Sequence, residues 1–167
     1  MKRHKAIQQL SRDHHKGLLL AQLVKKDAPH YKGLPTDPSG KLQYAIETFN
    51  NELFIHFSDE ENILFSAVKG KSAESDNLID ELIEEHKYFN EKISLLNGWI
   101  TTMDNDSDLI EKLDEFGKKL ERHIRKEERV LFNLIQEILS EDELSKIEQK
   151  ILDSRKNFTA GCNIKTK

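Results

Sequence analysis

The fold of this chain is decided by residues 107–139, which read SDLIEKLDEFGKKLERHIRKEERVLFNLIQEIL. Apolar residues recur there at intervals of three and four, which is the spacing of one face of an α-helix. The apolar face consists of Leu113, Phe116, Leu120, Leu131, Leu134 and Ile138. His123 and Glu127 interrupt this face between Leu120 and Leu131. The segment therefore predicts a long amphipathic helix with two ionisable side chains on its buried face.

Three further segments of similar length, at about residues 2–26, 39–68 and 75–102, show the same helical periodicity. Short clusters of turn-forming residues separate them, so consecutive helices are expected to be neighbours. Four long amphipathic helices joined by short loops predict an all-α, antiparallel up-down-up-down four-helix bundle.

A capping box at Ser140–Glu143 predicts a short fifth helix that ends near Leu152. We expect residues 1–153 to form one helical domain, the four-helix bundle with its short fifth helix, and residues 154–167 to form a polar, flexible tail.

Composition excludes several classes of protein. The 167 residues carry 26 basic and 30 acidic side chains, and the mild net negative charge argues against nucleic-acid binding. No apolar run reaches the roughly 20 residues that span a bilayer, and the N-terminal segment has no signal-peptide core, so we expect no membrane partner and a cytoplasmic location. A single cysteine, Cys162, excludes an internal disulfide framework and a cysteine-rich metal site.

Each long predicted helix directs at least one histidine toward the core, and two of them add a glutamate. The inward polar residues are His14, His56, Glu60, His86, His123 and Glu127. An unpaired buried carboxylate costs several kcal/mol, a large part of a typical net stability of roughly 5–15 kcal/mol. No lysine or arginine lies on these faces to neutralise the carboxylates, so the pattern favours a metal centre over a metal-free structural bundle.

The donor set also indicates the kind of metal. Four neutral nitrogens and two carboxylates suit iron, with manganese or zinc as possible substitutes. Six protein ligands are too many for one tetrahedral zinc, so we expect two ions that share the carboxylates. The ferritin-like Glu-x-x-His pattern is absent, because Leu53, Ile83 and Leu120 occupy the positions three before the inward histidines.

His14 and His15 compete for the ligand position in the first helix. His14 shares the apolar stripe of Leu10 and Leu18, which favours it over His15. His4 and His30 are expected at the surface, in a fraying helix end and in a loop.

The chain resembles the hemerythrin-like family, also called the HHE cation-binding domain, over about residues 5–140. The resemblance rests on Asp13-His14-His15, on His56-Phe57-Ser58-Asp59-Glu60, on His86 and on His123-Ile124-Arg125-Lys126-Glu127. It implies a four-helix bundle with a non-haem, oxo- or hydroxo-bridged di-iron centre. His14, His56, His86 and His123 would be terminal ligands, and Glu60 and Glu127 would bridge the two irons.

The chain departs from the oxygen-carrying hemerythrins, whose third helix carries two histidines four residues apart. Here Asn90 follows His86 by four, which is closer to a subgroup with four histidines and two glutamates. The departure weakens the expectation of reversible oxygen carriage and leaves a coordination position for a diatomic ligand or peroxide.

Two functional hypotheses remain open. The first is a binding module that senses or scavenges iron, oxygen or nitric oxide. The second is a di-iron redox enzyme that reduces nitric oxide or peroxide or supports iron–sulfur cluster repair, with Asp59, Glu61 and Tyr88 as candidates for a proton path. The sequence identifies no protein partner.

Overall fold

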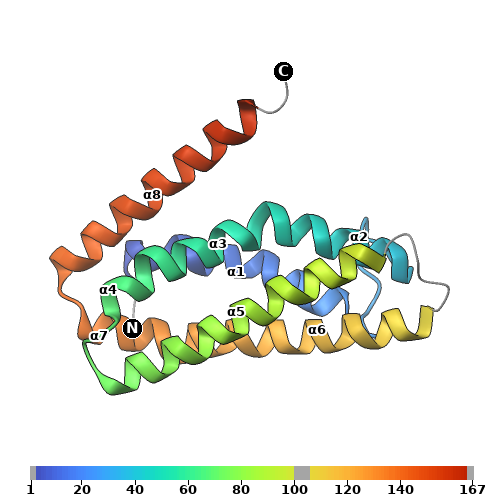
Figure 1. Ribbon diagram of the computed structural model, residues 1–167, viewed down its shortest axis with the longest axis horizontal. Helices are drawn as coiled ribbons and strands as arrows, with labels where there is room; N and C mark the ends of the chain where they lie inside the picture. Colours follow the sequence, from blue (N-terminus) through green and yellow to red (C-terminus); the bar gives the residue numbers. More distant parts are fainter. Residues whose placement is uncertain (1–2, 100–105, 165–167) are drawn as a thin grey trace.

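The computed structural model describes residues 3–99 and 106–164 of the chain. The regular structure of these residues is entirely helical, without a strand, which confirms the predicted all-α class. Four long helical segments lie side by side, and a fifth leaves them at an angle (Figure 1). None of the helices within the described residues combines the length and the apolar character that a membrane-spanning helix needs.

The first and third segments are single helices, α1 (Lys5–Leu23) and α5 (Ala73–Trp99). The second segment is continuous from Pro38 to Val68 but contains two π-helical turns, η1 and η2. Its parts are α2 (Pro38–Thr48), η1 (Phe49–Leu53), α3 (Phe54–Asp59), η2 (Glu60–Phe65) and α4 (Ser66–Val68). The fourth segment has one π-helical turn and consists of α6 (Asp106–Lys126), η3 (Glu127–Leu131) and α7 (Phe132–Ile138).

The helix starts follow the capping residues of the sequence. Asp37 accepts a hydrogen bond from the backbone N–H of Gly40 at 2.7 Å, and Pro38 occupies the first turn of α2. The predicted capping box is present, because Ser140 N–H donates to Glu143 Oε2 at 2.9 Å.

The fifth helix, α8 (Glu141–Ile164), is longer than expected, and its predicted end near Leu152 is wrong. The predicted boundary between residues 153 and 154 falls inside this helix. The stretch after Leu152 is polar as far as Asn157, but Ser154 and Arg155 bind buried carboxylates of the bundle and so attach this part of the helix to it. Residues 165–167 of the expected tail lie outside the described residues.

The core consists of two apolar clusters that lie on either side of the six inward polar residues. The α2-side cluster includes Leu20, Leu53, Phe89 and Leu120. The α8-side cluster includes Leu10, Leu64, Leu82 and Leu131, together with Ile147 and Ile151 of α8. In each of the four segments, the inward histidine lies between a residue of the α2-side cluster and a residue of the α8-side cluster. The polar layer is therefore enclosed by apolar packing on both sides.

Helices α1 and α6 approach each other closely at Gly117. A Cβ atom added there would lie 2.5 Å from the backbone oxygen of Ala21 and 2.7 Å from a methyl group of Val24. A backbone atom cannot move aside as a flexible side chain can, so this position requires glycine for space.

We expect Gly117→Ala to lower the free energy of unfolding by about 1–3 kcal/mol, the usual cost of overpacking a core. Gly98→Ala in α5 is the matched control, because an added Cβ there meets no atom within 4 Å. The control should gain about 0.5–1 kcal/mol from the better helix propensity of alanine. Urea unfolding followed by circular dichroism measures both, and equal stabilisation of the two variants would contradict the close approach.

Candidate metal centre

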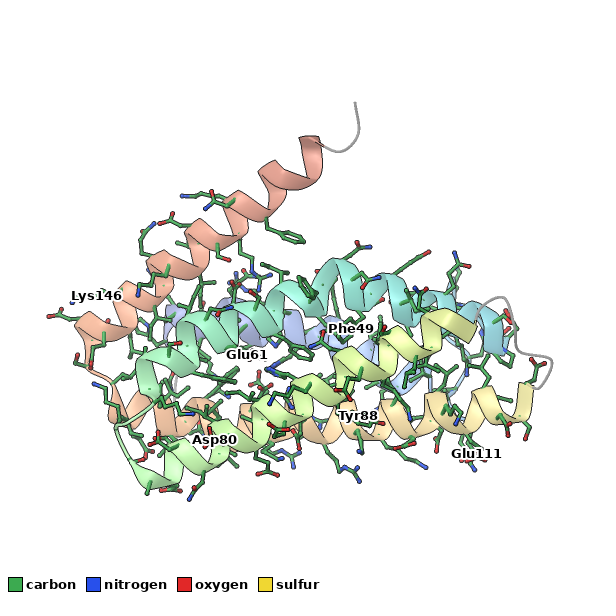
Figure 2. All side chains as sticks on the ribbon, viewed as in Figure 1. Phe49, Glu61, Asp80, Tyr88, Glu111 and Lys146 are labelled. Carbon is green, nitrogen blue, oxygen red and sulfur yellow. The ribbon has the colours of Figure 1, made fainter. Side chains whose placement is uncertain are left out.

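The six inward residues predicted from the sequence lie together in the middle of the bundle. α1 supplies His14, the second segment supplies His56 and Glu60, α5 supplies His86, and the fourth segment supplies His123 and Glu127. All six are buried, with relative exposures of 1% or less. Figure 2 shows side chains from the four segments filling the space between them.

The inner atoms of the site are the histidine Nε2 nitrogens and the glutamate oxygens. His14 Nε2 lies 3.1 Å from Glu127 Oε2, and His56 Nε2 lies 3.3 Å from Glu60 Oε2. His123 Nε2 lies 3.4 Å from Glu127 Oε1, and His86 Nε2 lies 3.5 Å from Glu60 Oε2.

These atoms form two overlapping groups, each compact enough to hold a metal ion. One group contains His14 and His56, the other contains His86 and His123, and both contain Glu60 and Glu127. Within each group the ligand atoms lie within 4.8 Å of one another. The two glutamates are thus placed where a carboxylate can serve two ions.

The outer nitrogen of each histidine faces a second carboxylate. His14 Nδ1 lies 2.7 Å from Glu128, His86 Nδ1 lies 2.8 Å from Glu61, and His123 Nδ1 lies 2.7 Å from Glu85. His56 Nδ1 lies 3.4 Å from Asp13. An outer carboxylate fixes the proton of the imidazole on Nδ1 and directs the Nε2 lone pair inward, the arrangement common among metal-binding histidines.

The inner atoms need a positive charge that the described side chains do not supply. All four carboxylate oxygens of Glu60 and Glu127 are buried without a hydrogen bond from the described residues. The Nε2 atoms of His14 and His56 lie 3.1 Å apart, and those of His86 and His123 lie 3.2 Å apart. Lone pairs that face lone pairs and carboxylates repel one another, so this donor set fits metal cations.

The pKa values point to the same need for positive charge. Burial lowers the pKa of His14, but the neighbouring carboxylates of Glu127 and Glu128 outweigh it and raise this pKa to about 10. Burial and the neighbouring charge of Glu127 raise the pKa of Glu60 well above its usual value. Burial lowers the pKa of His56 to about 4. Without a metal, the site therefore attracts protons at His14 and Glu60.

Aromatic rings pack against the histidines and help to exclude water. Phe57 stacks on His86 with ring centroids 3.9 Å apart, and Phe132 stacks on His14 at 5.4 Å. Phe89 contacts His123 edge to face at 5.3 Å. In such a dry site electrostatic attraction to a cation is stronger than in water.

Two of the three π-helical turns begin at the inner glutamates. η2 begins at Glu60 and η3 begins at Glu127, in each case four residues after an inward histidine. Such turns occur in α-helices mostly as single bulges and often at functional sites. They allow each glutamate and the following apolar residues to face the interior together.

The remaining sequence candidates lie outside the inner group. His15 and His30 are exposed, and His4 caps α1 by accepting a hydrogen bond from Ala6 N–H. Of the candidates for a proton path, Glu61 contacts His86, whereas Tyr88 donates to Glu115 at the surface. Asp59 accepts from Ser154 and Arg155.

The sequence reasoning missed two outer carboxylates, Glu85 and Glu128. Both lie on predominantly charged stretches, where only their positions next to the inner residues His86 and Glu127 set them apart. Asp13 precedes His14 in the motif quoted for the family, but its contact with His56 was not foreseen.

The fold and the site define a class of protein that holds cations inside a helical bundle. The family model described as the Hemerythrin HHE cation binding domain matches residues 4–135, well over half of the chain. The chain therefore belongs to this family. Comparisons with curated proteins and with solved structures gave no match.

The raised pKa of His14 predicts how the metal-free protein responds to pH. The folded state binds a proton at this site up to about pH 10, whereas the unfolded state releases it near pH 6.5. The stabilisation is complete below pH 6.5 and is lost as the pH rises toward 10, by up to about 1.4 kcal/mol per pH unit. Urea unfolding in the presence of a chelator measures this slope.

His14→Gln provides the control, because it removes the titrating group and should flatten the slope. Metal-loaded protein should lose no stability over this pH range, since metal binding requires deprotonated ligands. A metal-free protein whose stability rises between these pH values would contradict the raised pKa of His14.

Proposed function

We propose that this protein binds two iron ions within an up-down-up-down helical bundle, with manganese or zinc as possible substitutes. The ligands in this proposal are His14, His56, Glu60, His86, His123 and Glu127. The observation that carries it is the pair of overlapping groups that share Glu60 and Glu127, whose four oxygens are buried without hydrogen bonds. Membership of the cation-binding family supports the proposal.

The donor chemistry favours iron over a single zinc ion. Each group offers two imidazole nitrogens and oxygens of two carboxylates, a mixed set that suits borderline divalent ions. One tetrahedral zinc would leave at least two of the six donors buried without a cation. Two ions balance both glutamates and engage all four histidines.

We further propose that the centre binds or senses iron, oxygen or nitric oxide. An iron pair, when bound, supplies redox chemistry and coordination positions for a small ligand. α5 offers one histidine to the centre, and Asn90, one turn further along, donates its side-chain N–H to the backbone oxygen of His86 at 2.9 Å. The amide of Asn90 is thus engaged with the backbone, which supports a coordination position for a diatomic ligand or peroxide.

A redox enzyme that reduces nitric oxide or peroxide is the second candidate, and the outer carboxylates favour it. Glu61, Glu85 and Glu128 each contact an inner histidine, and their side chains are 38%, 31% and 25% exposed. Each can hold a proton at the Nδ1 atom of its histidine and exchange it with solvent. The chain therefore has the means to deliver protons that a reduction requires.

Protein expressed with iron should contain about two metal ions per chain and absorb in the near ultraviolet as a bridged di-ferric pair does. Glu127→Ala should lose both ions because Glu127 belongs to both groups, and Glu127→Gln tests the same point with less change in volume. His56→Ala should lose metal as well.

Elemental analysis with an optical spectrum measures these contents. His30→Ala is the control, since His30 is exposed and should leave the metal content unchanged. Equal metal content in all variants, or one zinc ion without iron in the unmodified protein, would contradict the proposal.

Stopped-flow mixing of the reduced, iron-loaded protein with oxygen, nitric oxide or peroxide separates the two functions. A binding protein should give a reversible spectral change of about one equivalent, because no net chemistry follows binding. Turnover with excess reductant would indicate the enzyme instead. In that case Glu85→Gln should slow turnover, since it removes a carboxylate that holds the His123 proton.

A further inference from the structure

The four outer carboxylates differ in their surroundings. Glu61, Glu85 and Glu128 are part-exposed, whereas the Asp13 side chain is only 8% exposed. Water can screen the first three charges, but it reaches Asp13 poorly. Asp13 therefore needs a protein partner for its charge.

Arg155 of α8 is that partner. Its Nη2 atom donates to Asp13 Oδ2 at 2.7 Å, and its Nε atom donates to Asp59 Oδ2 at 2.5 Å. Ser154 adds a hydrogen bond to the other oxygen of Asp59 at 2.6 Å. The planar guanidinium thus links two buried carboxylates that immediately precede His14 and Glu60 in the sequence. α8 contacts α1, α3 and η2, and its side chains extend toward the bundle (Figure 2).

The Asp13 oxygen that accepts from Arg155 is also the oxygen that faces His56. Asp13 Oδ2 lies 3.4 Å from His56 Nδ1, while Gln9 donates to the other oxygen, Oδ1, at 2.9 Å. Both oxygens of Asp13 are thus held by donors. His56 Nδ1 makes no hydrogen bond to the described residues, so Asp13 acts on it as a fixed negative charge 3.4 Å away. Such a charge favours the proton on Nδ1 and restricts the orientation of the imidazole.

Loss of Arg155 would leave Asp13 and Asp59 as buried charges without that guanidinium. Asp59 directly precedes Glu60, and the charge of Asp13 raises the pKa of Glu60, so the uncompensated negative charge beside Glu60 would grow. A carboxylate left without its cation in a buried position turns toward water or takes up a proton. Either response withdraws the support from His56.

We propose that Arg155 is a positioning residue for the metal position formed by His14 and His56, acting through Asp13. This inference rests on the proposed function of metal binding. It makes α8, which lies entirely beyond the residues matched by the family model, part of the metal centre. It also makes the two metal positions unequal, because only one of them depends on α8.

Lys126 offers a matched comparison at the other metal position. Its ammonium group binds Glu85 at 2.6 Å, and Glu85 accepts from His123 Nδ1 at 2.7 Å. The order of cation, carboxylate and imidazole is the same as for Arg155, Asp13 and His56. Glu85 is 31% exposed, however, so solvent can take over the role of Lys126.

The test is an anaerobic titration of the full-length, metal-free protein with ferrous iron, with metal content measured after gel filtration. Arg155→Met should weaken one of the two ions by about 10–100-fold and leave the other within about threefold. Lys126→Met should change neither ion by more than about fivefold. Arg155→Lys should restore part of the lost affinity because it returns the charge without the planar fork.

A second variant keeps the test valid if Arg155→Met alone does not fold. Arg155→Met combined with Asp59→Asn removes one of the two buried charges that lose the guanidinium and keeps Asp13, so it should fold and still bind one ion weakly. Circular dichroism checks its helix content. Selective loss of one ion with native helicity supports the proposal.

The possible failures are distinguishable. If the unmodified protein binds no pair of ions, the proposed function fails. If the unmodified protein binds two ions and Arg155→Met binds both equally well, the role of Arg155 is overturned while the function stands. Equal weakening of both ions would also overturn it, because the positions would not then differ in their dependence on α8.

Discussion

The structure depends on two glutamates that are fully buried beside four imidazole nitrogens. Glu60 and Glu127 receive no hydrogen bond from the described residues, so their negative charge requires a cation. The surrounding architecture makes this requirement stronger, because apolar clusters close the polar layer on both sides and aromatic rings cover the histidines. A bundle with these residues at its centre is organised around positive charge.

The helices bury these charged side chains and still pack closely against one another. Each of the four segments contributes an apolar residue to each cluster and places its inward histidine between the two. Stability then comes from the two clusters and from close helix contacts such as the one at Gly117. The same rigid contacts hold the six inward side chains in place, so folding also assembles the candidate site.

The sequence predicted the helices and the inner six residues for a clear physical reason. His86, for example, lies between Leu82 and Phe89 on an apolar stripe, where a polar residue is costly and therefore conspicuous. Glu85 and Glu128 lie beside such residues on polar stretches, where charged side chains are ordinary. The contact of Arg155 with Asp13 joins residues 142 positions apart, and Arg155 lies in a polar stretch of α8 where charged side chains are ordinary. No periodicity identifies such a contact.

The π-helical turns that begin at Glu60 and Glu127 have a consequence for how this protein can evolve. In both segments the helix changes its winding between the inner glutamate and the apolar residues of the α8-side cluster, such as Leu64 and Leu131. The parts of each segment before and after the π-helical turn therefore face the interior with the same side only if the turn keeps its number of residues. Substitutions can accumulate in these helices, whereas the insertion or deletion of a single residue would turn the inner glutamates away from the face that the apolar core supports.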